Sequence, residues 1–143
     1  TGKWATYRKG LLENMSELIV DNLVVKLFAT KDVFYYKYLN SSEFYKASYI
    51  DGIMKIEEIT ALKGWFSSWE LINDNIYYLA RIGDGPTKFY RYNLVTGKSE
   101  SLSEVDISET LRNIEFSVSA DENKIYYTRL EGKSTDLISL DIK

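Results

Sequence analysis

The residues that could carry chemistry in this chain are mainly acidic, because the sequence contains no histidine and no cysteine. That composition excludes Ser-His-Asp and Cys-His catalysis, disulfides, and zinc bound by histidine or thiolate. Two acidic clusters remain, Asp121-Glu122-Asn123 and Asp74-Asn75. Paired carboxylates can hydrolyse glycosidic bonds, but the sequence does not indicate which two carboxylates would form such a pair. A calcium-binding loop needs a longer alternating series of oxygen ligands than either cluster provides. Because aspartate and asparagine bond to their own backbone in turns, we expect structural turns at both clusters, without catalysis, metal or cofactor.

Two further segments could contact a ligand or partner. "GDGPTK" (83–88) looks like a phosphate-binding loop but lacks G-x-x-x-x-G-K-[ST] and precedes no helix, so it predicts a hairpin turn. In "GWFSSWE" (64–70), Trp65 and Trp69 would share a face of a regular strand. They would then either form a platform for a ligand or pack between sheets, and we favour packing. Asp84 and Tyr90 complete the candidate contacts.

The composition favours one β-rich domain. Of the 143 residues, 45% are hydrophobic and 15% aromatic, including twelve tyrosines. The net charge is −3 and there is no Lys/Arg-rich run, so we expect no direct nucleic-acid binding. No apolar run approaches the roughly 18 residues that cross a bilayer. The chain opens "TGKWATYRKG", without an initiator methionine or the apolar core of a signal peptide, so we expect it to derive from a longer protein.

An aromatic strand recurs along the chain. Its three copies are "DVFYYKYLNSS" (32–42), "DNIYYLARIGDG" (74–85) and "NKIYYTRLEG" (123–132). Val33, Ile76 and Ile125 occupy equivalent positions, and each copy is preceded by one β-like segment and followed by a turn and another. After the first two copies comes a more polar outer strand, at 53–59 and 98–104. Each unit therefore predicts up to four strands in about 40–50 residues, as in a propeller blade.

These strands are apolar on both faces, which is typical of a sheet stacked between two others. Tyr77 and Tyr78 should point to opposite faces and both be covered, and the same is expected of Tyr126 and Tyr127. A two-layer antiparallel sandwich is the alternative. We predict an all-β partial β-propeller of about three four-stranded antiparallel blades. Its units are a partial or degraded unit at 1–21, blades at 22–62 and 63–110, and a C-terminal blade, complete or incomplete, at 111–143.

The repeat resembles known proteins. "FSVSADENKIYYTRLEGKSTDLISLDI" (116–142) is similar to the repeat of TolB-type propellers, with a Ser-Ala-Asp turn, an aromatic strand and Asp-Leu-x-x-Leu-Asp. "WELINDNIYYLARIGDGPTKFYRYNLVTGKSESL" (69–102) resembles the C-terminal propellers of bacterial CadC-type winged-helix regulators. The resemblance implies a non-enzymatic sensor or interaction module, with DNA bound by a separate winged helix. It also implies an extracytoplasmic (periplasmic) location, and a cytoplasmic one is expected otherwise.

Two alternative functions are a TolB-like envelope scaffold that binds a protein partner and a propeller that gates a serine hydrolase. Closed propellers have about four to eight blades. Three blades would leave an apolar sheet face open at each end, and such faces rarely stay in water. The chain is then either the tail of a larger propeller or associates with a second copy that buries those faces. For the isolated chain we expect a homodimer through the exposed blade faces, and two three-blade halves would make a six-bladed pseudo-ring.

Overall fold

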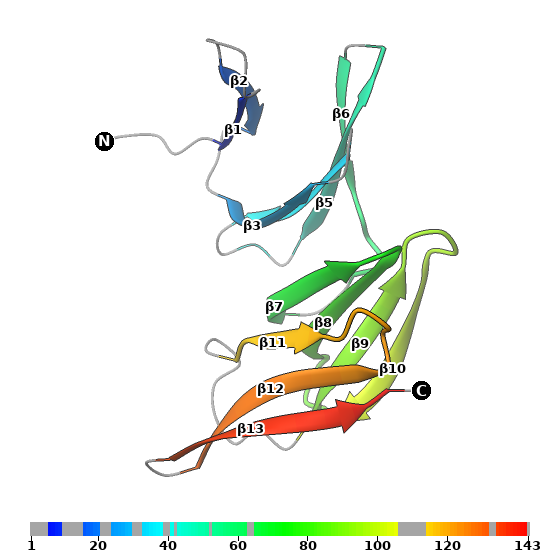
Figure 1. Ribbon diagram of the computed structural model, residues 1–143. Helices are drawn as coiled ribbons and strands as arrows, with labels where there is room; N and C mark the ends of the chain where they lie inside the picture. The colour runs from blue at the N-terminus through cyan, green and yellow to red at the C-terminus, as the bar shows by residue number, and fades with distance from the viewer. Residues whose placement is uncertain are drawn as a thin grey trace. The chain divides into compact units, whose positions relative to one another are not determined.

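The computed structural model is all-β, with antiparallel sheets (Figure 1). The chain divides into two compact units, Thr1–Thr60 and Ala61–Lys143. Within the described part of the chain, no helix is long and apolar enough to cross a bilayer. The backbone is described for residues 6–9, 16–20, 24–29, 33–38, 41, 43–51, 53–62, 65–105, 114–131 and 134–142.

The first unit contains a two-stranded and a four-stranded sheet. β1 (Thr6–Lys9) pairs with β2 (Ser16–Val20). The four-stranded sheet runs in chain order through β3 (Val24–Ala29), β4 (Val33–Tyr38), β5 (Phe44–Ile50) and β6 (Ile53–Glu58). Each strand of this sheet therefore pairs antiparallel with the next strand in the chain.

The second unit contains a four-stranded and a three-stranded sheet. The first consists of β7 (Trp65–Ile72), β8 (Asn75–Arg81), β9 (Thr87–Asn93) and β10 (Lys98–Glu104). The second consists of β11 (Phe116–Val118), β12 (Lys124–Glu131) and β13 (Ser134–Asp141). The prediction of an all-β fold with antiparallel sheets of three or four strands is confirmed; their arrangement as propeller blades stays a prediction.

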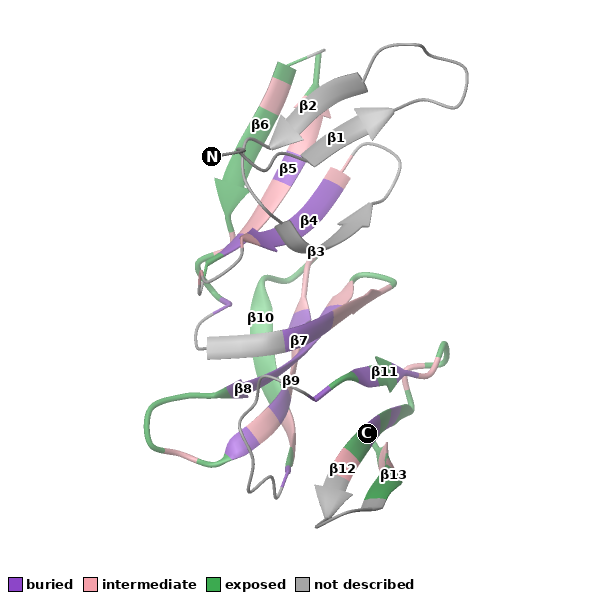
Figure 2. Ribbon diagram, turned by 90° about the vertical axis from the view of Figure 1, so that its left-hand side faces the viewer, coloured by how far each residue is buried: buried purple, intermediate pink, exposed green. Residues whose placement is uncertain are grey.

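Burial follows the position of each strand in its sheet (Figure 2). In β4, Phe34 to Lys37 are buried, and in β8, Ile76 to Ala80 are buried. The outer strands β6 and β10 are mostly exposed and drawn largely in green. A central strand that is buried on both faces needs a continuous apolar run, whereas an outer strand in water does not, which accounts for the sequence of each.

The two sheets of the second unit enclose its hydrophobic core. Tyr77, Leu79 and Phe89 from β8 and β9 pack against Phe116 and Tyr127. The ring centroids of Phe89 and Phe116 lie 5.0 Å apart, edge to face. Each large apolar side chain buried here contributes roughly 1.5–3 kcal/mol. This core fixes which faces of the two sheets meet, and so which polar side chains come together around it.

The third copy of the aromatic strand differs from the second. Tyr77, Tyr78 and Tyr127 are buried, as expected, but Tyr126 is 38% exposed. The expectation that both rings of the 126–127 pair are covered is therefore wrong for Tyr126. The physical reason is that Ile125 and Tyr127 pack against the preceding sheet, while alternation along β12 turns Tyr126 to the opposite face.

Candidate functional site

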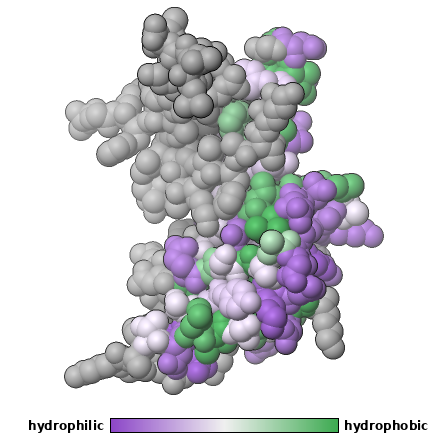
Figure 3. Space-filling view, in the orientation of Figure 1, coloured by the Kyte–Doolittle hydropathy of each residue, from purple (hydrophilic) through white to green (hydrophobic). Residues whose placement is uncertain are grey.

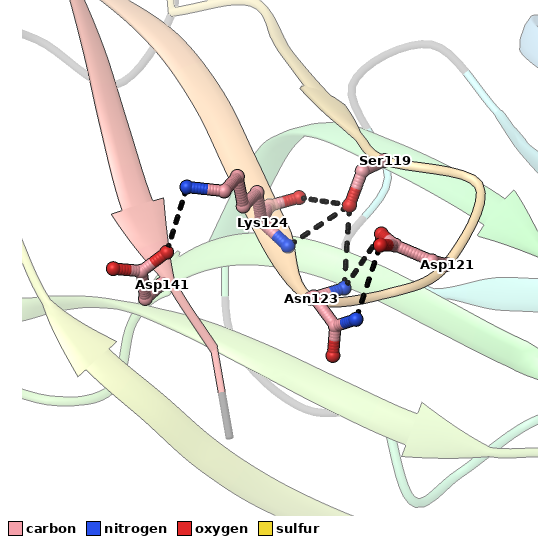
Figure 4. A network of polar contacts seen from close by, with 5 residues as sticks. All are labelled: Ser119, Asp121, Asn123, Lys124 and Asp141. Carbon is pink, nitrogen blue, oxygen red and sulfur yellow. Dashed lines mark hydrogen bonds and ion pairs between the residues drawn. The ribbon is translucent and has the colours of Figure 1, made fainter.

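The turn between β11 and β12 is held by its own side chains (Figure 4). The Ser119 hydroxyl donates to the carbonyl of Lys124 at 3.2 Å and accepts from its backbone N–H at 2.9 Å. The Asp121 carboxylate accepts from the backbone N–H of Asn123 at 3.2 Å and from its amide group at 3.1 Å. The Lys124 ammonium lies 3.0 Å from Asp141. The interpretation of this acidic cluster as a structural turn is confirmed.

Glu122 leaves this local network and reaches the neighbouring sheet. Its backbone is left-handed, with φ of 56°, a conformation that favours glycine. Its carboxylate accepts hydrogen bonds from Asn73 at 2.6 Å, Asn75 at 2.7 Å and the Tyr77 hydroxyl at 2.5 Å. We call this set the Glu122 clamp. One side chain thus joins the turn of the three-stranded sheet to the start of β8.

The electrostatics of the clamp favour an ionised Glu122. Burial acts to raise the pKa of its carboxyl, but the bonds from Tyr77, Asn73 and Asn75 and the charge of Arg91 outweigh it, so the pKa is lowered. Burial and the bond to Glu122 raise the pKa of Tyr77 to about 12. At neutral pH the clamp is therefore a carboxylate that accepts from a neutral phenol, the arrangement in which each bond is strongest.

A second carboxylate joins the same two sheets. Glu70 on β7 accepts a hydrogen bond from the backbone N–H of Val118 at 2.7 Å and a longer one from the Ser117 hydroxyl at 3.4 Å. The short strand β11 thereby lies beside β7 in Figure 1. Because the carboxylate occupies the position of a partner strand for this N–H group, the two sheets are joined through a side chain rather than a ladder.

Both carboxylates are engaged in contacts between the two sheets of the second unit. The carboxylates of Glu70 and Glu122 accept hydrogen bonds that hold sheets together, and each faces protein donors. No group of three or more His, Cys, Asp or Glu residues that could hold a metal ion occurs among the described residues. In this structure the two carboxylates act as acceptors of hydrogen bonds that join the sheets.

The structure describes the side chains of three of the four predicted contact residues, Trp69, Asp84 and Tyr90. Trp69 is 1% exposed, and its strand pairs with β8 so that Trp69 lies opposite Tyr78. Tyr90 stacks on Tyr78 with ring centroids 5.2 Å apart, so Trp69 and Tyr90 share one face of the sheet. Asp84 is exposed in the β8–β9 turn. The side chain of Trp65 lies outside the described residues.

The tryptophan platform rested on a regular strand, and β7 is not regular. Its register shifts between Phe66 and Trp69: Trp65 lies opposite Arg81, while Trp69 lies opposite Tyr78. Those two partners are three residues apart on β8 and so belong to opposite faces. Because the side chain of Trp65 lies outside the described residues, the tryptophan platform stays a prediction. Burial of Trp69 agrees with the packing interpretation for that residue.

A cluster of tyrosines in the first unit was not anticipated as a group. Tyr36, Tyr38 and Tyr45 lie with ring centroids 5.0–5.6 Å apart. The Tyr45 hydroxyl donates to Glu43 at 2.7 Å, and this bond is the main cause that raises its pKa to about 12. The cross-strand pairing of Tyr36 with Tyr45 was the available signal, but it requires the register of β4 and β5. These rings fill one face of the sheet with aromatic packing.

The remaining surface of interest is the exposed face of the three-stranded sheet. Pairing places Ser117 and Ser139 opposite Tyr126, and Leu137 opposite Thr128. We call these five residues the outer face. Leu137 is 73% exposed, and the other members apart from Tyr126 are small and polar. The exposed face of this sheet thus carries two large apolar side chains among small polar ones. On the side of the unit drawn in Figure 3, small hydrophobic areas likewise alternate with hydrophilic ones.

Comparison with known proteins supports the fold. No family model and no curated protein matches this chain. The crystal structure of TolB from Acinetobacter baumannii is similar to it, with a TM-score of 0.58 and 14% sequence identity. The match covers 90% of this chain and 32% of the TolB chain, so this chain spans about a third of TolB's length. At that identity the likeness concerns the fold alone, which is TolB-like.

Proposed function

We propose that this chain is a non-catalytic interaction or sensing module of a larger protein, the C-terminal propeller portion of a CadC-type winged-helix regulator. The observation that carries the proposal is that the polar side chains of the second unit join its sheets. Glu122 and Glu70 each bond across to the neighbouring sheet instead of facing an open site. A pair of sheets fixed in this way presents a constant outer face to a partner. The resemblance of 69–102 to CadC-type propellers supports the regulator context.

In this role the module brings two copies of the protein together. Tyr126 and Leu137 are the large apolar residues of the outer face, with 38% and 73% of their surfaces exposed. Burying them between two copies favours association, and the serines and threonine around them offer hydrogen bonds at the rim. Winged-helix heads that read paired half-sites depend on such association. A ligand or partner that competes for the outer face would then separate the heads.

The test uses the whole chain fused to a DNA-binding head that represses a reporter only as a dimer. We expect repression by the unaltered chain, and loss of at least about fivefold in the doubly substituted Tyr126→Arg, Leu137→Arg chain, since about 1 kcal/mol of association energy corresponds to that factor. The control is Val95→Arg, at a 77% exposed apolar residue of the β9–β10 turn, which should repress normally. Light scattering that gives one chain per particle at every concentration, together with no repression, would refute self-association.

A TolB-like envelope scaffold is the second candidate, favoured by the similarity in fold to TolB. The complete gene separates the two. A winged-helix domain upstream supports the regulator, whereas a secretory signal peptide without any DNA-binding domain supports the scaffold and removes the regulator context.

A further inference from the structure

The edge strand of the three-stranded sheet is unusually regular. β13 pairs with β12 through eight consecutive residues, from Ser134 to Asp141, without a register shift. In the part of the chain that the structure describes, no strand pairs with the other edge of β13. A long, flat edge presents a row of backbone N–H and C=O groups on which another strand can form.

The corresponding outer strands of the other sheets carry the features that normally prevent such pairing. β10 has a bulge between Ser101 and Ser103. β6 is unbroken but half charged, through Lys55, Glu57 and Glu58. β13, with the sequence STDLISLD, has neither a bulge nor a lysine or proline, and it exposes Leu137. Lysine, proline and bulges are the usual protection of sheet edges, so β13 is the least protected of these outer strands.

The other sheets also indicate what a fourth strand would look like. Both β6 and β10 run antiparallel to the third strand of their sheet. In both, cations on the third strand lie opposite glutamates on the fourth. These pairs are Lys46 with Glu57 in the register of the first unit, and Lys88 with Glu104 at 3.9 Å and Arg91 with Glu100 at 2.6 Å in the second.

At β13 the sign of this pairing is reversed. Ile76 and Ile125 are equivalent in the repeat, which makes Ala80 of β8 equivalent to Arg129 of β12. Ala80 lies opposite Lys88, and Arg129 lies opposite Asp136. Asp136 therefore occupies the position on the third strand that Lys88 occupies in the preceding sheet, where Lys88 pairs with Glu104 of the fourth strand. A fourth strand in this sheet is complementary when it carries a cation where β10 carries Glu104.

We propose that the open edge of β13 binds an extended strand of a partner protein, antiparallel to β13, with a basic residue opposite Asp136. Alternate side chains of that strand would lie beside Ile138 and Leu140 on the core side, and beside Leu137 on the other. Main-chain hydrogen bonds supply the affinity in this mode of recognition, and the side chains supply the choice of partner. The inference goes beyond the proposed function, because it concerns the edge of the sheet and not its outer face.

The probe is an acetylated, amidated seven-residue peptide, TVTVTKT, whose valines fall opposite Leu140 and Ile138 when its lysine falls opposite Asp136. The matched control is TVTVTET. Binding to the full chain is followed by amide NMR shifts and by amide hydrogen exchange along β13. We expect slower exchange in β13 with the lysine peptide and binding at least about fivefold weaker for the glutamate peptide, about 1 kcal/mol for one exposed pair.

The Asp136→Lys variant distinguishes specific pairing with β13 from nonspecific peptide binding. This exposed edge substitution should leave the amide spectrum folded and reverse the order of the two peptides. Unchanged β13 exchange with both peptides at millimolar concentration overturns the proposal, as does a peptide order that Asp136→Lys does not reverse. If β13 is already protected without peptide in the Tyr126→Arg, Leu137→Arg chain, and the particle mass of that chain is still that of two chains, the occupant is a second copy, which also overturns the proposal. Loss of the outer-face contacts through Tyr126→Arg and Leu137→Arg tests self-association separately, so the two proposals can fail independently.

Discussion

Replacing Glu122 tests whether the clamp between the two sheets of the second unit contributes to stability. Its carboxylate accepts three hydrogen bonds, at 2.5–2.7 Å, from Asn73, Asn75 and Tyr77. Bonds to a buried charge contribute about 1.5–3 kcal/mol each, but this site is partly exposed, so about 1 kcal/mol each is the appropriate figure. Glu122→Ala should therefore lower the free energy of unfolding by about 3 kcal/mol.

The left-handed backbone at Glu122 gives the experiment an internal comparison. A side chain at φ of 56° costs roughly 1 kcal/mol that glycine does not incur. Glu122→Gly removes the same three bonds but relieves this strain, so it should cost about 2 kcal/mol, less than alanine. Glu122→Gln keeps one acceptor oxygen and should fall between the unaltered chain and Glu122→Ala. The order of the variants is a sharper test than any single value.

The assay is urea unfolding followed residue by residue through amide NMR signals of β8 and β12, so that the second unit is observed by itself. Asp84→Ala, in an exposed turn, is the control and should change stability by less than about 0.5 kcal/mol. If Glu122→Ala lies within that range of the unaltered chain, the clamp has no energetic role. If glycine destabilises as much as alanine, the reasoning from backbone strain is wrong.

Four further outcomes are expected. Folding lowers the pKa of Glu122, so its carboxylate stabilises the fold above its ordinary pKa, and this stabilisation is lost as the pH falls through the folded pKa. The free energy of unfolding of Glu122→Gln should therefore fall less steeply with acid than that of the unaltered chain. The pKa of Tyr77 is raised to about 12, so stability should fall as the pH rises from 10.0 to 12, and Tyr77→Phe should reduce this loss in alkaline urea titrations. Thr87 is 2% exposed with its hydroxyl unbonded among the described residues, so Thr87→Val should be neutral or stabilising by up to about 1 kcal/mol in thermal unfolding. Tyr126→Arg with Leu137→Arg should leave the amide spectrum folded, because both side chains are exposed.

The strands could be predicted from the sequence because their burial follows local pattern. Ile76 to Ala80 form a continuous apolar run, and all five are buried. The exposure of Tyr126 could not be predicted, because "IYY" reads identically at 76–78 and 125–127. What differs is how far each ring is covered, with Tyr78 1% and Tyr126 38% exposed, and that depends on tertiary packing and not on the sequence of the strand.

The candidate site was predicted in part for a similar reason. Turns were expected at Asp121 and Asn123 because their bonds are local, within five residues along the chain. The clamp was missed because Glu122 meets Asn75 and Tyr77 from more than forty residues away. The register shift in β7 between Phe66 and Trp69 likewise has no signal in "WFSSWE", since it depends on how β7 pairs with β8.

The repeat itself explains why a bond forms between Asn73 and Glu122. Both residues stand three positions before the equivalent Ile76 and Ile125, and both have positive φ, of 49° and 56°. Stacking two copies of one hairpin brings equivalent turn residues side by side, so identical charged residues there would repel across the interface. Here the two copies differ at this position. Asn73 supplies an amide donor and Glu122 a carboxylate acceptor, and the two form a 2.6 Å hydrogen bond. Glu122 thus accepts a backbone conformation better suited to glycine because only a longer polar side chain at that position can reach the preceding sheet.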